Sequence, residues 1–233
     1  MLRTLFLFLL FTIGQSHLAN AADDTESAIA LYNAQDYHAA FSAFEKLAET
    51  DLVAQYYLAN MYAGGQGTEP NKEKSFHWFL MSAEQGHPKA QFKTGLAYNE
   101  GFGTKKDPAT AISWFEKAAD QGVPEAQFYL AVAYQQGELV EKDLVKAVKW
   151  LKLAAKQGIP EAQNNLANFY NEGMGVRQDN ELAFAWYSIA TLSGNEQAEI
   201  NQQMLSAKMT QQELDQAQKL AEKIYSRMQE SQK

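Results

Sequence analysis

A repeat of 36 residues constrains the fold of this chain more than any other feature of its sequence. All four Trp residues lie 36 positions apart, at 78, 114, 150 and 186. Three more columns keep this step, namely Tyr62, Tyr98, Tyr134 and Tyr170; Gly65, Gly101, Gly137 and Gly173; and Gly86, Gly122, Gly158 and Gly194. A period of this length is typical of arrays in which each unit buries the apolar face of its neighbour. The sequence therefore predicts a repeat array over residues 51–194.

Each repeat is predicted to form two helices, as residues 124–157 illustrate. Pro124 suits the first turn of a helix, where the missing N–H costs nothing. Apolar residues then recur at helical spacing, and Gly137 can take the left-handed conformation that ends a helix. Asp143 stands where the second helix needs an N-cap, and Trp150 lies on its apolar stripe. The predicted fold class is all-α, built from antiparallel helix pairs.

The typed positions resemble those of the Sel1-like repeat family, a close relative of the tetratricopeptide repeat. One segment carries them in order: Ala162, Leu166, Ala167, Tyr170, Gly173, Gly175, Asp179, Ala183 and Trp186. The chain departs from the pattern at Leu139, which replaces a loop Gly, and at Thr94-Gly95, where Leu-Ala is usual. The resemblance implies a right-handed superhelix, an α-solenoid, whose concave face binds protein or peptide partners.

The two ends of the array have different patterns. Residues 22–50 are expected to form a tetratricopeptide-like helix pair, and residues 195–233 are expected to form capping helices. Thr210 and Glu213 form a capping box that would open the last of these helices. Its apolar spacing also fits a coiled-coil or partner helix, but two heptads are fewer than the three or four that such structures use.

Residues 1–21 have the pattern of a secretory signal peptide. Arg3 precedes an apolar run over 5–13, and Ala19-Asn20-Ala21 is an A-x-A cleavage motif. No later stretch approaches the roughly 20 apolar residues of a transmembrane helix. We therefore expect a periplasmic or secreted mature protein without a transmembrane segment. An uncleaved N-terminal anchor is the alternative.

The composition and motifs argue against several kinds of chemistry. The chain has no Cys, which removes disulfides and Cys-ligated metals. Its net charge of −8 argues against a nucleic acid partner. HExxH, GxSxG and Walker A motifs are all missing from the sequence. We expect no enzymatic activity, no catalytic residue, no metal site and no cofactor. Some disulfide-rich relatives in the resembled family are reported as β-lactamases, and the missing Cys residues separate this chain from them.

Steps of 100° along the first helix of each repeat indicate which residues face the concave groove. The groove candidates are Tyr56, Asn60, Phe92, Leu96, Glu100, Phe128, Val132, Gln136, Asn164, Asn168 and Glu172. Aromatic side chains beside carboxamides suit a peptide, because they offer apolar anchors and hydrogen bonds for a backbone. The alternative is that the aromatic members simply pack against neighbouring helices.

These features together favour a non-enzymatic interaction scaffold of the bacterial cell envelope that binds a protein or peptide in its groove. Two alternatives stay open. The first is a factor that binds or processes envelope glycan (peptidoglycan), because aromatic rings stack on sugars; a cell-wall component would then be the partner. The second is a secreted effector that binds a host protein, as the resemblance to some bacterial proteins implies.

Overall fold

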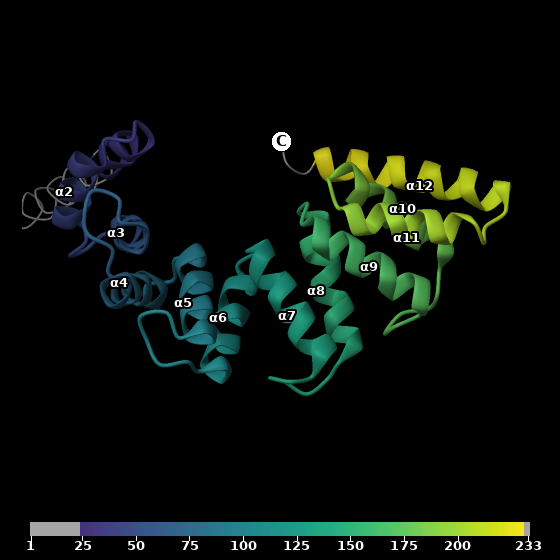
Figure 1. Ribbon diagram of the computed structural model, residues 1–233, viewed down its shortest axis with the longest axis horizontal. Coiled ribbons are helices and arrows are strands. Elements are labelled where there is room, and N and C mark those ends of the chain that lie inside the picture. The colour runs from purple at the N-terminus through teal and green to yellow at the C-terminus, as the bar shows by residue number, and fades with distance from the viewer. Residues whose placement is uncertain (1–23, 231–233) are drawn as a thin grey trace, which may run out of the picture. The chain divides into compact units, whose positions relative to one another are not determined.

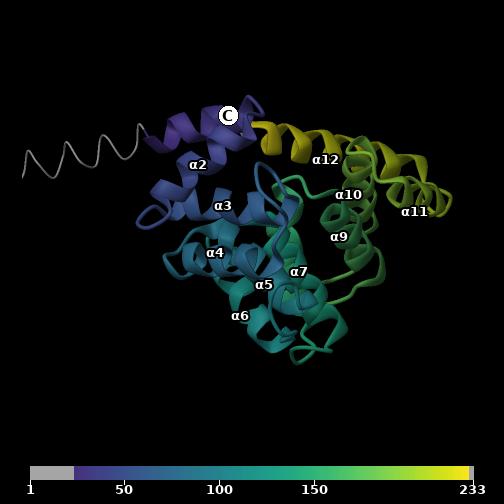
Figure 2. The same ribbon diagram turned by 60° about the vertical axis from the view of Figure 1, so that its left-hand side comes forward.

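The computed structural model describes residues 24–230, and every regular element in this range is an α-helix (Figures 1 and 2). This confirms the predicted all-α class. The signal peptide expected over residues 1–21 lies outside the described range. None of the helices within it is both long and apolar enough to span a bilayer. The described chain divides into two compact units between Trp114 and Phe115, inside α6 (Pro108–Asp120).

The N-terminal unit begins with the helix pair expected over 22–50. A helix over 24–33 is followed by α2 (Tyr37–Leu47), α3 (Leu52–Gly64), α4 (Lys72–Glu84) and α5 (Pro88–Glu100). From α2 to α5, each helix packs against the next. Phe44, Leu58 and Met61 are fully buried at the centre of the first pairs. The first pair is therefore part of the same core as the repeat that follows it.

The C-terminal unit contains the later repeats and the cap. Its complete helices are α7 (Pro124–Gln136), α8 (Leu144–Lys156), α9 (Pro160–Glu172), α10 (Asn180–Leu192), α11 (Glu196–Ser206) and α12 (Gln211–Glu230). Both α11 and α12 pack against α10 (Figure 1). Ala217, Ala221 and Met228 are the buried residues of α12. The last helix therefore packs on the array, as expected for a capping helix.

The helix ends follow the predicted caps. The Asp143 carboxylate accepts a hydrogen bond from the Lys146 N–H at 2.9 Å, and Asn71 and Asp179 cap α4 and α10 in the same way. Thr210 and Glu213 form the expected reciprocal capping box. These local signals place the helix starts where the sequence predicts them.

The loop between the two helices of a repeat contains two Gly columns, and the second of them permits a close approach to another part of the backbone. A Cβ added to Gly103, which has a φ of +65°, would lie 2.0 Å from the carbonyl oxygen of Lys72 at the start of α4. Gly67 and Gly175 occupy the same position in their repeats. Leu139, which replaces this Gly, is 45% exposed. Gly67, Gly103 and Gly175 therefore provide space as well as a backbone conformation that favours Gly.

Two side-chain columns fill the layers between helices. Trp114, Trp150 and Trp186 are buried, whereas Trp78 is only half-buried. The second column, absent from the predictions, consists of buried glutamines that each donate to a carbonyl oxygen near the end of the preceding helix: Gln55 to Ala48, Gln91 to Ala83, Gln127 to Ala119 and Gln163 to Ala155. Each repeat is therefore fastened to its predecessor by a side-chain amide as well as by apolar packing.

Candidate functional site

A cavity of about 170 Å³ lies between α3, α4 and α5 in the N-terminal unit. Three predicted groove residues, Asn60, Leu96 and Glu100, line this cavity together. The remaining lining residues are Ala63, Phe79, Lys93, Ala97 and Phe102. The geometry thus brings together part of the site that helical steps predicted.

The lining of this cavity is amphiphilic. Lys93 and Glu100 both come from α5, and neither forms an ion pair within residues 24–230. Leu96 and Phe102 supply apolar surface. The Asn60 amide donates from Nδ2 to the carbonyl oxygen of Tyr56 at 2.7 Å, which fixes it against its own helix. A cavity of this size with one cation and one carboxylate at its walls suits a single side chain of a bound peptide.

Tyr56 is engaged in packing within the N-terminal unit. Its ring stacks on His87, with ring centroids 4.6 Å apart and an interplanar angle of 14°. It also packs against Phe79, with ring centroids 5.9 Å apart. Tyr56 therefore follows the alternative interpretation of the aromatic column, in which the rings pack against neighbouring helices. Phe92, its counterpart on α5, is half-buried.

The His87 side chain caps α5 in its neutral form. Its Nδ1 accepts a hydrogen bond from the Ala90 N–H at 3.1 Å. Burial lowers the pKa of His87 below its ordinary value of 6.5, and the charge of Lys89 acts in the same direction. Protonation of Nδ1 would remove the acceptor that the cap requires.

In the C-terminal unit, two groove candidates are bound to the cap. The Asn201 amide of α11 donates from Nδ2 to Oδ1 of Asn164 at 3.1 Å and to Oδ1 of Asn168 at 3.4 Å. The Tyr187 hydroxyl also donates to Asn168, at 2.6 Å. Burial raises the pKa of Tyr187 to about 12, so the hydroxyl keeps its proton at neutral pH. Asn164 is only 8% exposed, and both carboxamides are engaged inside the unit.

The other candidates of this unit keep accessible surface. Phe128 and Val132 on α7 are half-buried, and Gln136 and Glu172 at the ends of α7 and α9 are exposed. They retain the surface that a partner contact requires, and no lining of the C-terminal cavities includes them.

The groove columns continue onto α11, where the sequence analysis did not follow them. Ile200 and Met204 stand 36 positions after Asn164 and Asn168, and they are 51% and 62% exposed. The same step that identified the earlier columns would have found them. These columns therefore carry exposed apolar side chains on α11, unlike the two engaged asparagines of α9.

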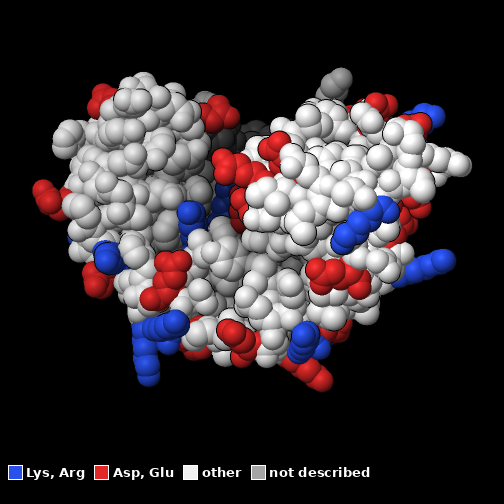
Figure 3. Space-filling view, turned by 45° about the vertical axis from the view of Figure 1, so that its right-hand side comes forward, with Lys and Arg blue, Asp and Glu red and all other residues white. Residues whose placement is uncertain are grey.

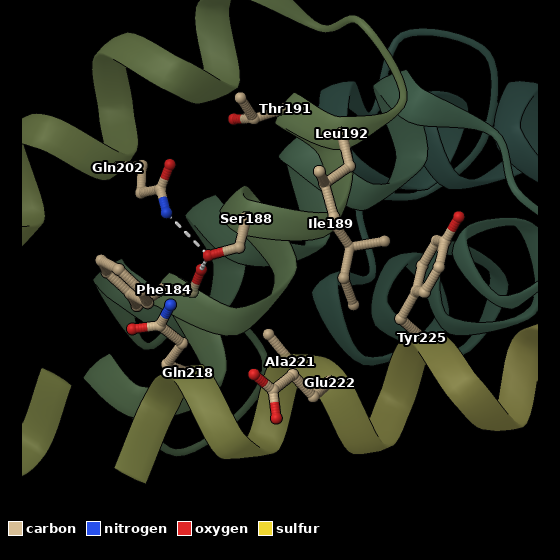
Figure 4. A pocket seen from close by; sticks show the side chains of 10 residues that line it. All are labelled: Phe184, Ser188, Ile189, Thr191, Leu192, Gln202, Gln218, Ala221, Glu222 and Tyr225. Carbon is tan, nitrogen blue, oxygen red and sulfur yellow. Dashed lines mark hydrogen bonds between the residues drawn. The ribbon is translucent and has the colours of Figure 1, made fainter. Parts of the chain in front are cut away.

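A second cavity that sequence reasoning missed lies between α10, α11 and α12 (Figure 4). Its volume is about 400 Å³. Ile189 and Leu192 of α10 face Tyr225 of α12, and on the opposite side Gln202 donates from Nε2 to the Ser188 hydroxyl at 2.7 Å (Figure 4). No simple periodic signal marks this cavity, because α12 departs from the repeat.

The described part of the chain contains no group of three or more His, Asp or Glu side chains that could hold a metal ion. His87 is accounted for by its capping role, and the groups that line the cavities above include no nucleophile paired with a base. What the arrangement offers chemically is a set of surfaces for apolar contacts and hydrogen bonds.

Comparisons with known proteins agree with this architecture. The family model for the Sel1 repeat matches residues 52–87, 88–123, 124–159 and 160–195. The crystal structure of a Sel1 repeat protein from Oxalobacter formigenes is 31% identical, with 76% of this chain and 74% of that chain covered and a TM-score of 0.72. A Sel1 repeat protein from Klebsiella pneumoniae subsp. pneumoniae shares the fold at 18% identity and a TM-score of 0.51, with 82% of this chain and 96% of that chain covered. A search of curated proteins gives no match.

Proposed function

The chain belongs to the Sel1 repeat family, and from this premise we propose that it is a non-enzymatic scaffold that binds a protein or peptide in the bacterial cell envelope. Sel1 repeat proteins commonly mediate protein–protein interactions, and the fold is typically an interaction scaffold without catalysis. Function nevertheless depends on a site and not on a fold. The proposal therefore requires a surface that a partner can use.

The cavity between α3, α4 and α5 is the observation that carries the proposal. It combines Leu96 and Phe102 as apolar surface with Lys93 and Glu100 as charges that have no ion-pair partner within 24–230. Interaction sites commonly combine a central apolar anchor with polar groups at the rim. Asn60, Leu96 and Glu100 are proposed as the contact residues of this unit.

Site-specific photocrosslinking in intact cells tests the proposal. A photoreactive amino acid at position 96 should give a discrete adduct with one partner. Glu84 is an exposed residue of α4 that does not line the cavity, so the same probe at position 84 serves as the control. The proposal is wrong if both positions give the same adducts, or if position 96 gives none.

A charge reversal tests whether Glu100 contributes to partner binding at the cavity. Glu100→Lys places a cation at the cavity, whereas Glu84→Lys makes the same change of charge outside it. Both residues are exposed, so the melting temperature should change little. Only Glu100→Lys should weaken the adduct at position 96. Equal adduct yields in the two variants would argue against this site.

The envelope location rests on the signal peptide expected over residues 1–21. Mass spectrometry of the purified protein should find Ala22 at the N-terminus, because cleavage is expected after Ala21. Cell fractionation should place this form in the periplasm or the medium. An intact Met1 in the cytoplasmic fraction would contradict the proposed location.

A further inference from the structure

A cavity of about 500 Å³ in the C-terminal unit has an apolar floor and a basic rim. The floor consists of Tyr170, Leu182, Trp186, Ile224 and Met228, and the rim consists of Lys152, Lys156 and Arg227. The lining residues come from α8, α9, α10 and α12, all of which belong to the same unit. The site is separate from the groove columns of α7, α9 and α11.

The basic rim is unusual for a chain with a net charge of −8. Lys and Arg side chains are interspersed with Asp and Glu side chains over the face shown in Figure 3, but no carboxylate lines this cavity. Over residues 24–230 the only ion pair is Lys146–Asp143, so none of the three rim cations has an ion-pair partner there. The lining of this cavity therefore carries three positive charges and no negative one.

The repeat itself shows that the fold does not require these cations. Lys152 and Lys156 lie four residues apart on α8, where like charges repel each other. In the preceding repeat the same two columns hold Glu116 and Asp120. Since both repeats form the same helix pair with opposite charges, the lysines are a feature of this cavity and not of the repeat.

The cation–π contact to the Tyr ring of this cavity differs from those in two earlier repeats. Lys74 and Lys146 lie over the rings of Tyr62 and Tyr134, each within its own repeat. The same column holds Thr110 in the repeat between these two and Leu182 in the repeat after Lys146, and Leu182 lines the floor. The ring of Tyr170 is met instead by Lys152 of the preceding repeat, with its Nζ 5.5 Å from the ring centroid. Leu182 therefore adds an apolar side chain to the floor, while Lys152 lies over the Tyr170 ring.

A more polar cavity of about 860 Å³ adjoins the first and shares Lys152 and Tyr170 with it. Its other lining residues are Val176, Arg177, Gln178, Asp179, Asn180, Glu181 and Glu213. Arg177 and Arg227 are the only arginines of the described chain, and they line the two cavities. Three residues of the second cavity, Asp179, Glu181 and Glu213, are carboxylates. An acidic group therefore suits the first cavity, and only an uncharged or basic continuation of a peptide suits the second.

We propose that the first of these cavities binds an acidic peptide segment that carries an apolar side chain. The apolar side chain packs on Leu182, Trp186 and the α12 residues of the floor. Carboxylates on either side of it pair with the rim cations, which form strong charge-assisted hydrogen bonds. The inference rests on the proposed function as a binding scaffold and assigns a second surface and a partner chemistry to it.

Isothermal titration of the purified protein with the acetylated and amidated peptide Gly-Asp-Leu-Asp-Gly tests the chemistry. We expect saturable binding at peptide concentrations up to about 1 mM. Peptides with Asn in place of both Asp residues, or with Gly in place of Leu, should bind at least about tenfold more weakly. The inference is overturned if the acidic peptide does not bind, or if its neutral analogue binds equally well.

Variants of the rim locate the binding. Arg227→Gln and the double variant Lys152→Gln with Lys156→Gln should each weaken peptide binding by about tenfold or more. Lys149→Gln is the matched control, because Lys149 is on the same helix but lies over Trp150 outside the cavity. Unchanged melting temperatures would show that the variants remain folded. Equal losses in all variants, including the control, would overturn the assigned site.

Two further outcomes separate the alternatives. Vesicles of phosphatidylglycerol that bind the protein more tightly than the acidic peptide, with the same dependence on Arg227, would identify a lipid surface and overturn the peptide assignment. Photocrosslinking at position 96 reports on the proposed function independently. If that adduct persists while the acidic peptide fails to bind, the failure belongs to this inference alone.

Discussion

Gln157 donates a hydrogen bond from its Nε2 to the Oε1 of Gln127 at 2.9 Å. Gln127 donates in turn to the carbonyl oxygen of Ala119 at 3.1 Å, so two amides link the ends of α8 and α6 through α7. Gln85 and Gln55 repeat this relation in the N-terminal unit, at 2.7 Å. The relay satisfies a buried side-chain oxygen that would otherwise cost free energy.

The relay is broken in the last repeat, which predicts a stabilising substitution. Gln163 keeps its hydrogen bond to Ala155, but its buried Oε1 has no partner among the described residues. Ser193 occupies the column of Gln157, and its hydroxyl donates to the carbonyl oxygen of Ile189 instead, at 3.0 Å. Ser193→Gln should supply the missing donor and raise the free energy of unfolding by about 1 kcal/mol. Urea-induced unfolding followed by circular dichroism measures the change.

The reverse substitution is the control for this prediction. Gln157→Ser should leave Oε1 of Gln127 buried without its donor, and it should lower the free energy of unfolding by about 1–3 kcal/mol. Opposite signs for the two substitutions would identify the relay as the cause. If Ser193→Gln is neutral or destabilising while Gln157→Ser is also neutral, the relay contributes nothing to stability.

Much of the fold could be predicted because its signals are local and periodic. Pro124, Gly137 and Asp143 act through the backbone of their own helix ends, and the structure has those ends where the sequence predicts them. The glutamine columns repeat with the same step, but the sequence analysis did not predict their role. Gln is usually an exposed residue, so the sequence alone does not show that these side chains are buried. Gln127 is buried because it bonds to a carbonyl eight residues earlier, a contact that depends on how two helices pack.

The candidate site was less predictable, because angular steps around one helix do not show which neighbours cover it. Asn60, Leu96 and Glu100 do share a cavity. Asn164 has the same angular position as Tyr56 but lies under α11, bonded to Asn201. The basic cavity at α12 lies outside what a repeat pattern can predict, because α12 itself departs from the pattern.

The close approach at the second loop Gly predicts an unequal pair of Gly substitutions. Gly103→Ala should lower the free energy of unfolding more than Gly86→Ala. Both residues have a positive φ, but a Cβ at Gly86 meets nothing within 4 Å, whereas one at Gly103 meets backbone atoms. Gly86→Ala should cost about 1–2 kcal/mol for conformation alone, and Gly103→Ala clearly more. Equal losses in thermal denaturation would show that the loop moves away at no cost.

Burial of the Trp column predicts a large loss on truncation. Trp150→Ala should lower the free energy of unfolding by about 3–5 kcal/mol, as expected for a buried large-to-small substitution. Trp150 is 9% exposed, whereas Trp78 is half-buried in the first repeat. Trp78→Ala should therefore cost less and serves as the control. A loss below about 1 kcal/mol for Trp150→Ala would contradict its structural role.

The neutral His87 cap predicts that acid weakens the N-terminal unit. Burial lowers the pKa of His87 in the folded state below 6.5, so the unfolded chain takes up the proton first as the pH falls. The stability that depends on neutral His87 is complete above about pH 6.5 and is lost as the pH falls from there towards the folded-state pKa. His87→Asn keeps an N-cap acceptor that does not titrate. Urea unfolding of the two proteins between about pH 7.5 and 5.5 should therefore show a steeper loss in the wild type. Identical slopes would show that His87 is not the source of the pH dependence.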